Sequence, residues 1–239
     1  MGATPPSPAA TGTGMASKAE LTNMATAKLN VAQRLARTLS NIFVPIIPAI
    51  VASGHAGDAR AANRSLLIDA SGGIVARYDK LHVFDVNLPN GETYRESATV
   101  RPGDGASVAD TPWGRLGLTI CYDIRFPHLY RALAKAGAGM ISVPAAFTVP
   151  TGEAHWETLL RARAIETGAF VLAPAQGGSH EDGRKTWGRS TVVGPWGEIV
   201  AKLDHDEPGV LFATLELDAV QRARQAVPAL SHDRDFIPA

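Results

Sequence analysis

Apolar residues recur at intervals of three and four in an early stretch of the chain. Over residues 18–39 they are Leu21, Ala25, Leu29, Ala32, Leu35 and Leu39. This spacing puts them on one face of a helix. The preceding residues, 1–17, are rich in Ala, Gly, Pro, Thr and Ser, a composition that does not bury a core. The pattern therefore predicts a disordered tail over 1–17 and a helix over 18–39, and it becomes irregular over 40–62.

Short apolar runs separated by turn residues begin near Asn63. The runs 65–69 and 74–78 are joined by the turn sequence ASGG, which predicts a β-hairpin. Residues 83–105 are polar and contain Pro, Gly and Asn, which predicts a long loop of the kind that lines active sites. Leu116, Leu118 and Ile120 then alternate with other residues, which predicts a strand that ends at Cys121.

Strands and helices alternate through the second half of the chain. We expect a helix from Pro127 that ends near Gly137, and a second helix over 154–167 that ends at Gly168. The expected strands are 140–143, 170–174, the hairpin 190–193 with 198–203, and 210–217; a last helix starts at Asp218 and runs to 226. Hairpins between the helical units favour a layered α/β fold with a mixed sheet, in a single domain over residues 18–239.

Composition and charge exclude several classes of partner. The 239 residues are 45% hydrophobic and carry 23 basic and 23 acidic side chains, so neither nucleic acid nor an anionic membrane is an expected partner. The longest apolar run, 42–52, is too short to span a bilayer and contains two prolines. The start of the chain lacks the features of a secretory signal. We therefore expect a cytoplasmic protein.

One cysteine, Cys121, is present. It excludes an intramolecular disulfide and a cysteine-based metal site, and the His, Asp and Glu residues show no metal-site spacing. No cofactor is expected. Cys121 is either a small buried apolar residue or a nucleophile. Its place between an apolar strand and a helix that starts with proline favours the nucleophile, because such a turn exposes a side chain and offers N–H groups to an oxyanion.

Three histidines raise the alternative of a cysteine–histidine hydrolase. His82 is next to a lysine segment, His128 lies on the helix after the turn, and His155 lies near a helix start. None has a spacing that favours a role as the base of Cys121. Arg125 has two interpretations: a salt bridge within its loop, or a clamp for a substrate carboxylate.

Several segments resemble the nitrilase superfamily, specifically its Nit-type amidase branch. They are GLTICYDIRFPHLYRALAKAG (117–137), RYDKLHVFDV (77–86), YRES (94–97), PAAFTVPTGEAHWETLLRARAIE (144–166) and PWGEI (195–199). The resemblance covers residues 63–236. It implies a four-layer αββα sandwich, a homodimer, and hydrolysis of the C–N bond of a small carboxylate-bearing amide by an ω-amidase-like or deaminated-glutathione-amidase-like enzyme.

The resemblance also implies roles for individual residues. Cys121 attacks the amide carbonyl and forms a thioester, while Lys80 and the backbone N–H of Tyr122 stabilise the oxyanion. Glu96 matches the additional glutamate of the family, which positions the lysine. We expect the pocket to be shaped by four further residues: Arg125, Phe147, Thr148 and His155.

The N-terminal part departs from this pattern. The general base of the family is a glutamate in an apolar-Pro-Glu segment, and in IIPA, residues 46–49, Ala49 stands where the glutamate would be. The acids that precede Lys80 are Glu20, Asp58, Asp69 and Asp79, and none has such a context. Part of the first β-α-β unit is therefore expected to be missing. The alternative function is a catalytically impaired member that binds a small molecule or a subunit.

Overall fold

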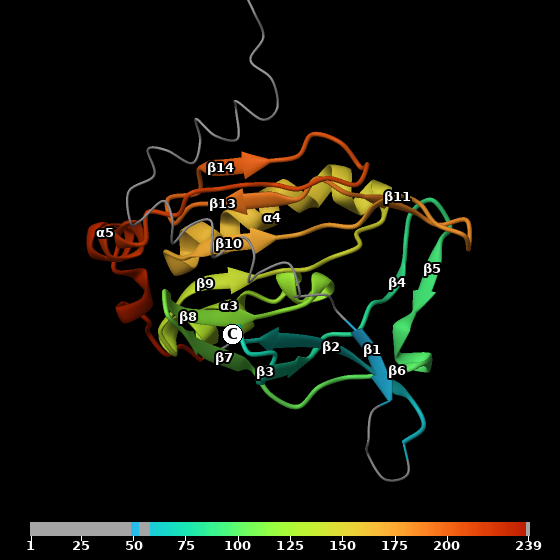
Figure 1. Cartoon of the computed structure of the whole chain (residues 1–239), viewed down its shortest axis with the longest axis horizontal. Helices are drawn as coiled ribbons and strands as arrows, with labels where there is room; N and C mark the ends of the chain where they lie inside the picture. Colours follow the sequence, from blue (N-terminus) through green and yellow to red (C-terminus); the bar gives the residue numbers. More distant parts are fainter. Residues whose placement is uncertain (1–48, 53–57, 238–239) are drawn as a thin grey trace, which may run out of the picture.

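The computed structural model describes residues 49–52 and 58–237 (Figure 1). The predicted tail over 1–17 and helix over 18–39 lie outside these residues. Within them, no helix combines the length and the apolar character that crossing a bilayer requires.

A six-stranded mixed sheet forms the centre of the fold (Figure 1). Its strands, in spatial order, are β14 (Ile199–Lys202), β13 (Thr191–Val193), β10 (Phe170–Ala173), β9 (Ala138–Ser142), β8 (Gly114–Leu118) and β7 (Ser107–Thr111). The central strands β8, β9 and β10 are parallel, and the outer pairs are antiparallel. Helical crossovers join the parallel strands, and hairpins join β7 to β8 and β13 to β14. The predicted mixed sheet is thus confirmed.

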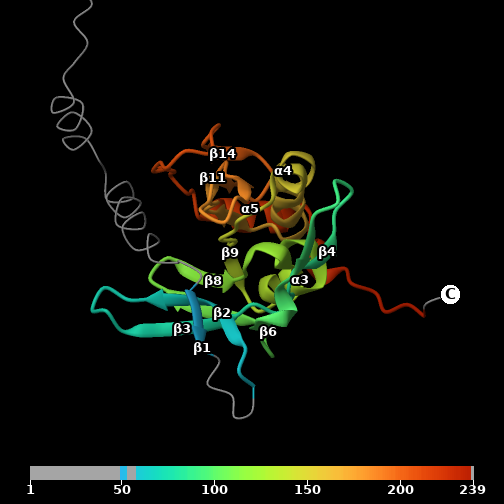
Figure 2. The ribbon, with the colours of Figure 1, turned by 90° about the vertical axis from the view of Figure 1, so that its right-hand side faces the viewer.

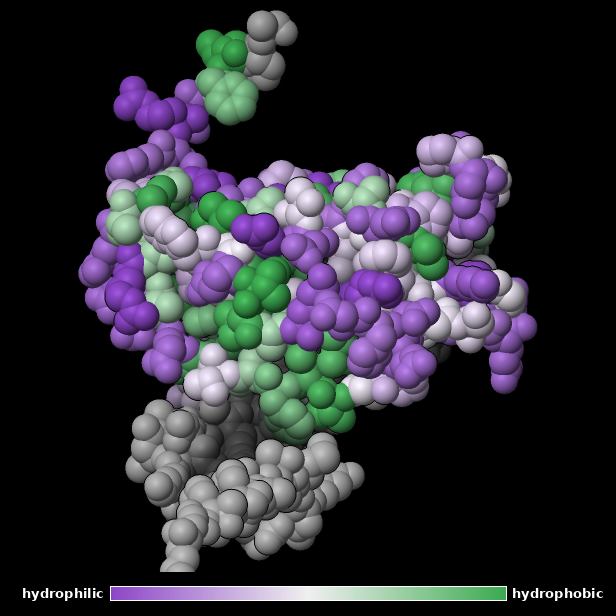
Figure 3. All heavy atoms as spheres, turned by 90° about the horizontal axis from the view of Figure 1, so that it is seen from above, coloured by the Kyte–Doolittle hydropathy of each residue, from purple (hydrophilic) through white to green (hydrophobic). Residues whose placement is uncertain are grey.

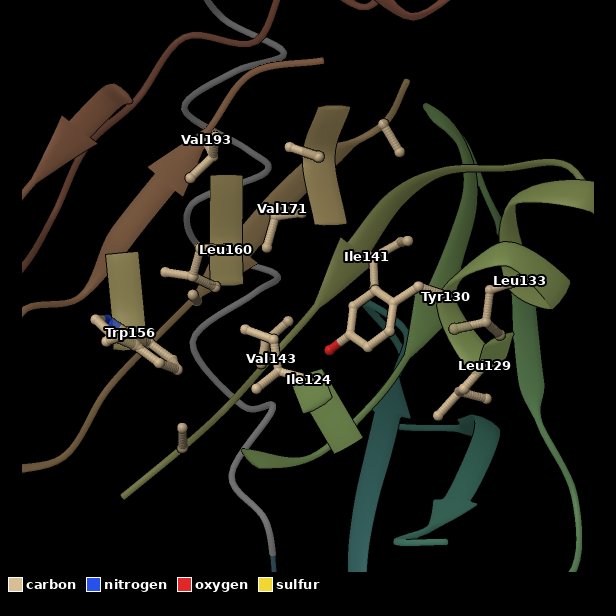
Figure 4. Close-up of a cluster of buried hydrophobic side chains, with 14 of the residues drawn as sticks. Ile124, Leu129, Tyr130, Leu133, Ile141, Val143, Trp156, Leu160, Val171 and Val193 are labelled. Carbon is tan, nitrogen blue, oxygen red and sulfur yellow. The ribbon is translucent and has the colours of Figure 1, made fainter. Parts of the chain in front are cut away.

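Two helices cover one face of this sheet. They are α3 (Pro127–Lys135) and α4 (Val149–Thr167). Figure 4 shows Tyr130 and Leu133 of α3 and Leu160 of α4 pointing toward Ile141 and Val171 of the strands. All five side chains are buried, and burying each large apolar side chain is worth about 1.5–3 kcal/mol. This packing fixes the ends of β8, β9 and β10 relative to the helices.

A second sheet lies on the opposite face (Figure 2). It contains β1 (Ala49–Ala52), β2 (Ala61–Ile68), β3 (Ile74–Asp79) and β6 (Val100–Arg101). Leu67 and Tyr78 from this sheet pack with Met140 and Phe170 of the central sheet. The described residues therefore form three layers, α, β and β, of the expected four. The predicted hairpin is confirmed as β2 and β3.

The ends of α3 and α4 follow the predicted signals. Pro127 is the first residue of α3, and Gly137 follows the helix with a φ of 93°. Gly168 follows α4 with a φ of 55°, a left-handed conformation that glycine adopts without strain. However, α4 begins at Val149, five residues before the prediction, because Pro150 is tolerated within the first turn of a helix.

Two other predictions need correction. The loop predicted over 83–105 contains a hairpin, β4 (Asp85–Asn87) with β5 (Thr93–Arg95), and the short helix η1 (Glu96–Ala98). The strand predicted over 210–217 is wrong: these residues pair with no strand in the described part of the chain. Their alternation shows which side chains face inward, but a strand also needs a neighbour for its backbone N–H and C=O groups.

The remaining elements lie around this framework. They are η2 (Cys121–Arg125), the hairpin of β11 (Gly177–Ser179) and β12 (Lys185–Trp187), α5 (Asp218–Ala226) and η3 (Ala229–Ser231). The last predicted helix is thus confirmed as α5. Seen from above, most of the surface is polar, and apolar side chains gather in a few patches near its middle (Figure 3).

Candidate active site

One cavity of about 1530 Å³ contains Cys121, Lys80 and Glu96 among its lining residues. It lies where β8, β9 and β10 end, because the segments that follow these strands contribute residues 120–122, 144–148 and 174–177 to its wall. Ligands of open α/β sheets bind at this edge, the carboxyl ends of the parallel strands. The fold therefore brings together three residues that are far apart in the sequence.

The alternation predicted a strand that ends at Cys121, and this prediction needs correction. The strand β8 ends at Leu118, and Cys121 is the first residue of η2. Its φ is 49°, and its N–H donates to the carbonyl oxygen of Pro144 at 2.9 Å. A left-handed conformation costs a residue other than glycine on the order of 1–3 kcal/mol and is enriched at functional sites. The half-buried side chain faces the cavity from this strained turn.

Burial raises the pKa of the Cys121 thiol, and the positive charge of Lys80 acts in the opposite direction. The charge of Glu96 raises the pKa of the thiol further. The thiol is therefore protonated at neutral pH, and a nucleophilic attack needs a group that accepts its proton.

Lys80 and Glu96 form a close ion pair. Only 3% of the lysine side chain is exposed, and its Nζ donates to Glu96 Oε2 at 2.5 Å. The N–H of Phe84 donates to the same oxygen at 2.6 Å, and Asn63 Nδ2 donates to Oε1 at 3.2 Å. A buried ammonium held in this way is a fixed positive charge, which is suited to stabilising an oxyanion without reorganisation.

The other predicted pocket residues divide into two groups. Tyr122, Arg125, Phe147 and Thr148 line the cavity, whereas His155 is exposed and is not among the lining residues. Arg125 Nη2 donates to His155 Nδ1 at 3.2 Å. The guanidinium lies 5.5 Å from the ring centroid of Phe147. Among the described residues no carboxylate forms a salt bridge with Arg125, which removes the first of its two interpretations.

Burial also lowers the pKa of Arg125. A desolvated guanidinium without an anionic partner favours the binding of an anion, because the pairing recovers part of the lost solvation. Arg125 is therefore a candidate for binding a negatively charged group of a ligand.

The described part of the cavity wall contains three carboxylates: Glu96, Asp206 and Glu207. Of the acids that precede Lys80, the described ones do not line it; Asp58 pairs with Arg60, and Asp79 pairs with Arg64. Ala49 lies in β1, and Glu20 is outside the described residues. No group of three or more His, Cys, Asp or Glu residues in the described ranges is arranged to hold a metal ion.

Two neighbours of the site were not predicted. Asn63 lines the cavity and donates to Glu96. Asp123 is buried, and its charge acts on the thiol of Cys121. Asn63 is one of three consecutive polar residues in β2, with Arg64 and Ser65, so the local sequence carried no signal that singled it out. The signal for Asp123 was its position two residues after the cysteine, within the segment used for the resemblance.

Comparisons with known proteins agree with this geometry. Residues 7–225 match the family described as carbon–nitrogen hydrolase. A deaminated glutathione amidase of Yersinia enterocolitica is 51% identical over 171 residues, which cover 71% of this chain and 59% of the relative. One from Synechocystis sp. is 42% identical over 224 residues, covering 91% and 81% of the two chains. The chain thus spans about three fifths of the length of the Yersinia relative.

Solved structures show the same fold. The Caenorhabditis elegans NitFhit protein superimposes with a TM-score of 0.72 at 39% identity, over 91% of this chain and 53% of that chain. An amidase from Nesterenkonia sp. AN1, in complex with butyramide, gives a TM-score of 0.57 at 31% identity, over 71% and 61% of the two chains. The expected α/β fold is therefore confirmed.

Proposed function

Since the chain belongs to the carbon–nitrogen hydrolase family of the nitrilase superfamily, we propose that it is a thiol amidase whose nucleophile is Cys121. The proposed substrate is a small linear amide that carries a carboxylate. The main support for this proposal is that a strained cysteine turn and a buried lysine–glutamate pair line the same cavity. Related chains with the name deaminated glutathione amidase support the same class of reaction.

The proposed reaction has two stages. Cys121 Sγ forms a bond to the amide carbonyl carbon and passes its proton to a base, while Lys80 Nζ and the N–H of Tyr122 donate to the oxyanion. The C–N bond then breaks, the amine leaves with a proton, and a thioester remains. Water attacks the thioester, and the carboxylic acid leaves with regeneration of the thiol. Glu96 holds the lysine, and because it lines the cavity it is the described candidate that we propose to accept protons.

The test of this proposal is ammonia release from a small ω-amide such as α-ketoglutaramate by the purified chain. Formation of a stoichiometric acid product with the ammonia would support hydrolysis, and the Cys121→Ala variant supplies the blank. Ammonia release that persists in this variant would contradict the assignment. A homodimer and a cytoplasmic location remain predictions.

Arg125 is proposed to bind the carboxylate of the substrate. We expect Arg125→Lys to raise KM for α-ketoglutaramate by about tenfold, because a lysine cannot reproduce the two parallel hydrogen bonds of a guanidinium. Butyramide, which has no carboxylate, is the matched control substrate, and its kcat/KM should change little. Equal losses for the two amides would show that Arg125 has a structural role only.

The second candidate function, an impaired member that binds without turnover, is favoured by Ala49 at the place of the expected glutamate. A missing general base typically costs about 10²- to 10⁴-fold in rate. We therefore expect this chain to hydrolyse α-ketoglutaramate at least about a hundredfold more slowly than the Synechocystis relative, measured side by side. An equal rate would mean that another acid is the base.

In that case Glu96→Gln tests whether the base is Glu96. The matched control is Glu92→Gln, which changes an exposed carboxylate in the same loop. Full turnover in both variants excludes Glu96 as the base. Loss of turnover in Glu96→Gln alone shows that this carboxylate is needed, either as the base or as the partner of Lys80.

A further inference from the structure

A completely buried carboxylate, Asp123, lies two residues after Cys121 and has no part in the proposed chemistry. Its exposed fraction is 0%. Burying a carboxylate is costly unless donors surround it. The donors that surround Asp123 therefore indicate what this residue does.

Four donors reach Asp123 (distances are between donor and acceptor atoms). Oδ2 accepts from the Tyr78 hydroxyl at 2.7 Å and from the N–H of Ile120 at 2.8 Å. Oδ1 accepts from the N–H of His82 at 3.1 Å and from His82 Nδ1 at 2.8 Å. Because a carboxylate can only accept, Nδ1 carries the ring proton of His82. Each oxygen of this carboxylate thus accepts two hydrogen bonds.

These donors come from two segments that the proposed mechanism uses. Tyr78 and His82 flank Lys80 by two residues on each side, and Ile120 precedes Cys121. Lys80 points to Glu96, while its two neighbours point to Asp123. The carboxylate thus connects the lysine segment to the cysteine turn.

Two further contacts strengthen the connection. The ring of His82 stacks on Phe126, with centroids 3.5 Å apart and an angle of 7° between the planes. Phe126 directly follows η2, so the histidine contacts both the middle of the turn, at Asp123, and the residue after its end. The hydroxyl of Tyr78 also accepts from the N–H of Leu81 at 3.3 Å, next to the lysine.

We propose that Asp123, Tyr78 and His82 form a positioning clamp that holds Cys121 Sγ in place relative to Lys80 Nζ. The catalytic consequence rests on the proposed amidase function. The bond from Ile120 to Asp123 closes the turn around the cysteine, whose left-handed φ would otherwise relax. The hydrogen bonds from Tyr78 and His82 to Asp123 connect this closed turn to the segment that contains Lys80.

The test uses Tyr78→Phe and His82→Phe in the full chain. Each removes one donor to Asp123 and keeps the charge of the carboxylate, and His82→Phe also keeps an aromatic ring on Phe126. We expect kcat for α-ketoglutaramate to fall by about ten- to a hundredfold, since small displacements of reacting groups have effects of this size. KM should stay within about twofold. Asp110→Asn, which changes an exposed carboxylate, is the control.

A second readout needs no amidase activity: the rate of alkylation of Cys121 by iodoacetamide as a function of pH. The charged groups that act on the thiol are Lys80, Glu96 and Asp123. The thiol also interacts with Arg125 and with the buried phenol of Tyr130.

Lys80 lowers the pKa of the thiol, so displacing it should shift the alkylation midpoint to higher pH in Tyr78→Phe and His82→Phe. Asp123→Asn also removes a negative charge that raises the pKa of the thiol. Its two effects oppose each other, so it does not serve as the deciding variant.

The outcomes separate the clamp from the proposed function. If both phenylalanine variants are folded and keep the kcat and the alkylation profile of the wild type, the clamp proposal is wrong. A lower Tm with both quantities unchanged indicates a structural role only and also overturns it. If the wild type releases no ammonia, the amidase proposal fails, but the shift of the alkylation profile still decides whether the clamp exists.

Discussion

The Cys121→Ala variant is expected to show no measurable amide hydrolysis, a loss of at least about 10⁴-fold in kcat. The proposed thioester requires a cysteine Sγ, and Cys121 is the single cysteine of the chain. Catalytic groups that act as a unit lose nearly all of their joint effect when the nucleophile is removed. Ammonia release from α-ketoglutaramate is the measurement.

The substitution is also expected to leave the fold intact. Alanine and cysteine both have a Cβ, so the strain of the left-handed turn is the same in the two proteins. Unchanged circular dichroism and Tm are the control. Iodoacetamide should label the wild type at one site per chain, abolish its turnover, and leave the variant unlabelled. A variant with wild-type rates would refute the nucleophile assignment.

Replacing Lys80 by arginine is expected to lower kcat by at least about 10²-fold, the loss typical of removing one oxyanion donor. The side chain is buried and lies 2.5 Å from Glu96, so the larger planar guanidinium cannot occupy the same position while keeping its direction toward the cavity. Because arginine retains the positive charge, the loss of kcat would show that the position of the charge matters. Steady-state kinetics with α-ketoglutaramate measures the effect, and KM should change much less than kcat.

Lys135→Arg is the matched control, since this exposed lysine of α3 pairs with Asp233 and lies outside the cavity lining. Lys80→Ala completes the series by removing the charge. If Lys80→Arg and Lys80→Ala both keep the activity of the wild type, the lysine has only a structural role. Activity in the arginine variant alone would show that charge suffices and position does not matter.

The local sequence determined most of the elements near the site. Pro127, Gly137 and Gly168 act through their own backbone preferences, so the boundaries that they set for α3 and α4 could be predicted without a fold. The runs of buried residues in the central strands likewise reflect burial on two faces. The motif residues Cys121 and Lys80 were found from their immediate neighbours and the resemblance these neighbours carry.

Contacts between distant segments were not predictable from these local signals. The alternation over 210–217 predicted a strand, but whether it forms depends on a neighbouring backbone, and the described residues supply none. His155 has a suitable position in the motif, yet the direction of its helix face leaves it exposed. Asn63 reaches Glu96 only because the sheet brings β2 beside the loop.

The sequence by itself determined which chemical groups this protein offers: one thiol, a lysine between a tyrosine and a histidine, and a glutamate in a polar loop. Only the tertiary structure decided how they meet. It placed the cysteine in a left-handed turn after the strand, and it joined Tyr78 and His82 to Asp123 across 45 and 41 residues. The physical reason is that a buried carboxylate must collect its donors from whatever segments pack around it, and packing is a property of the whole fold.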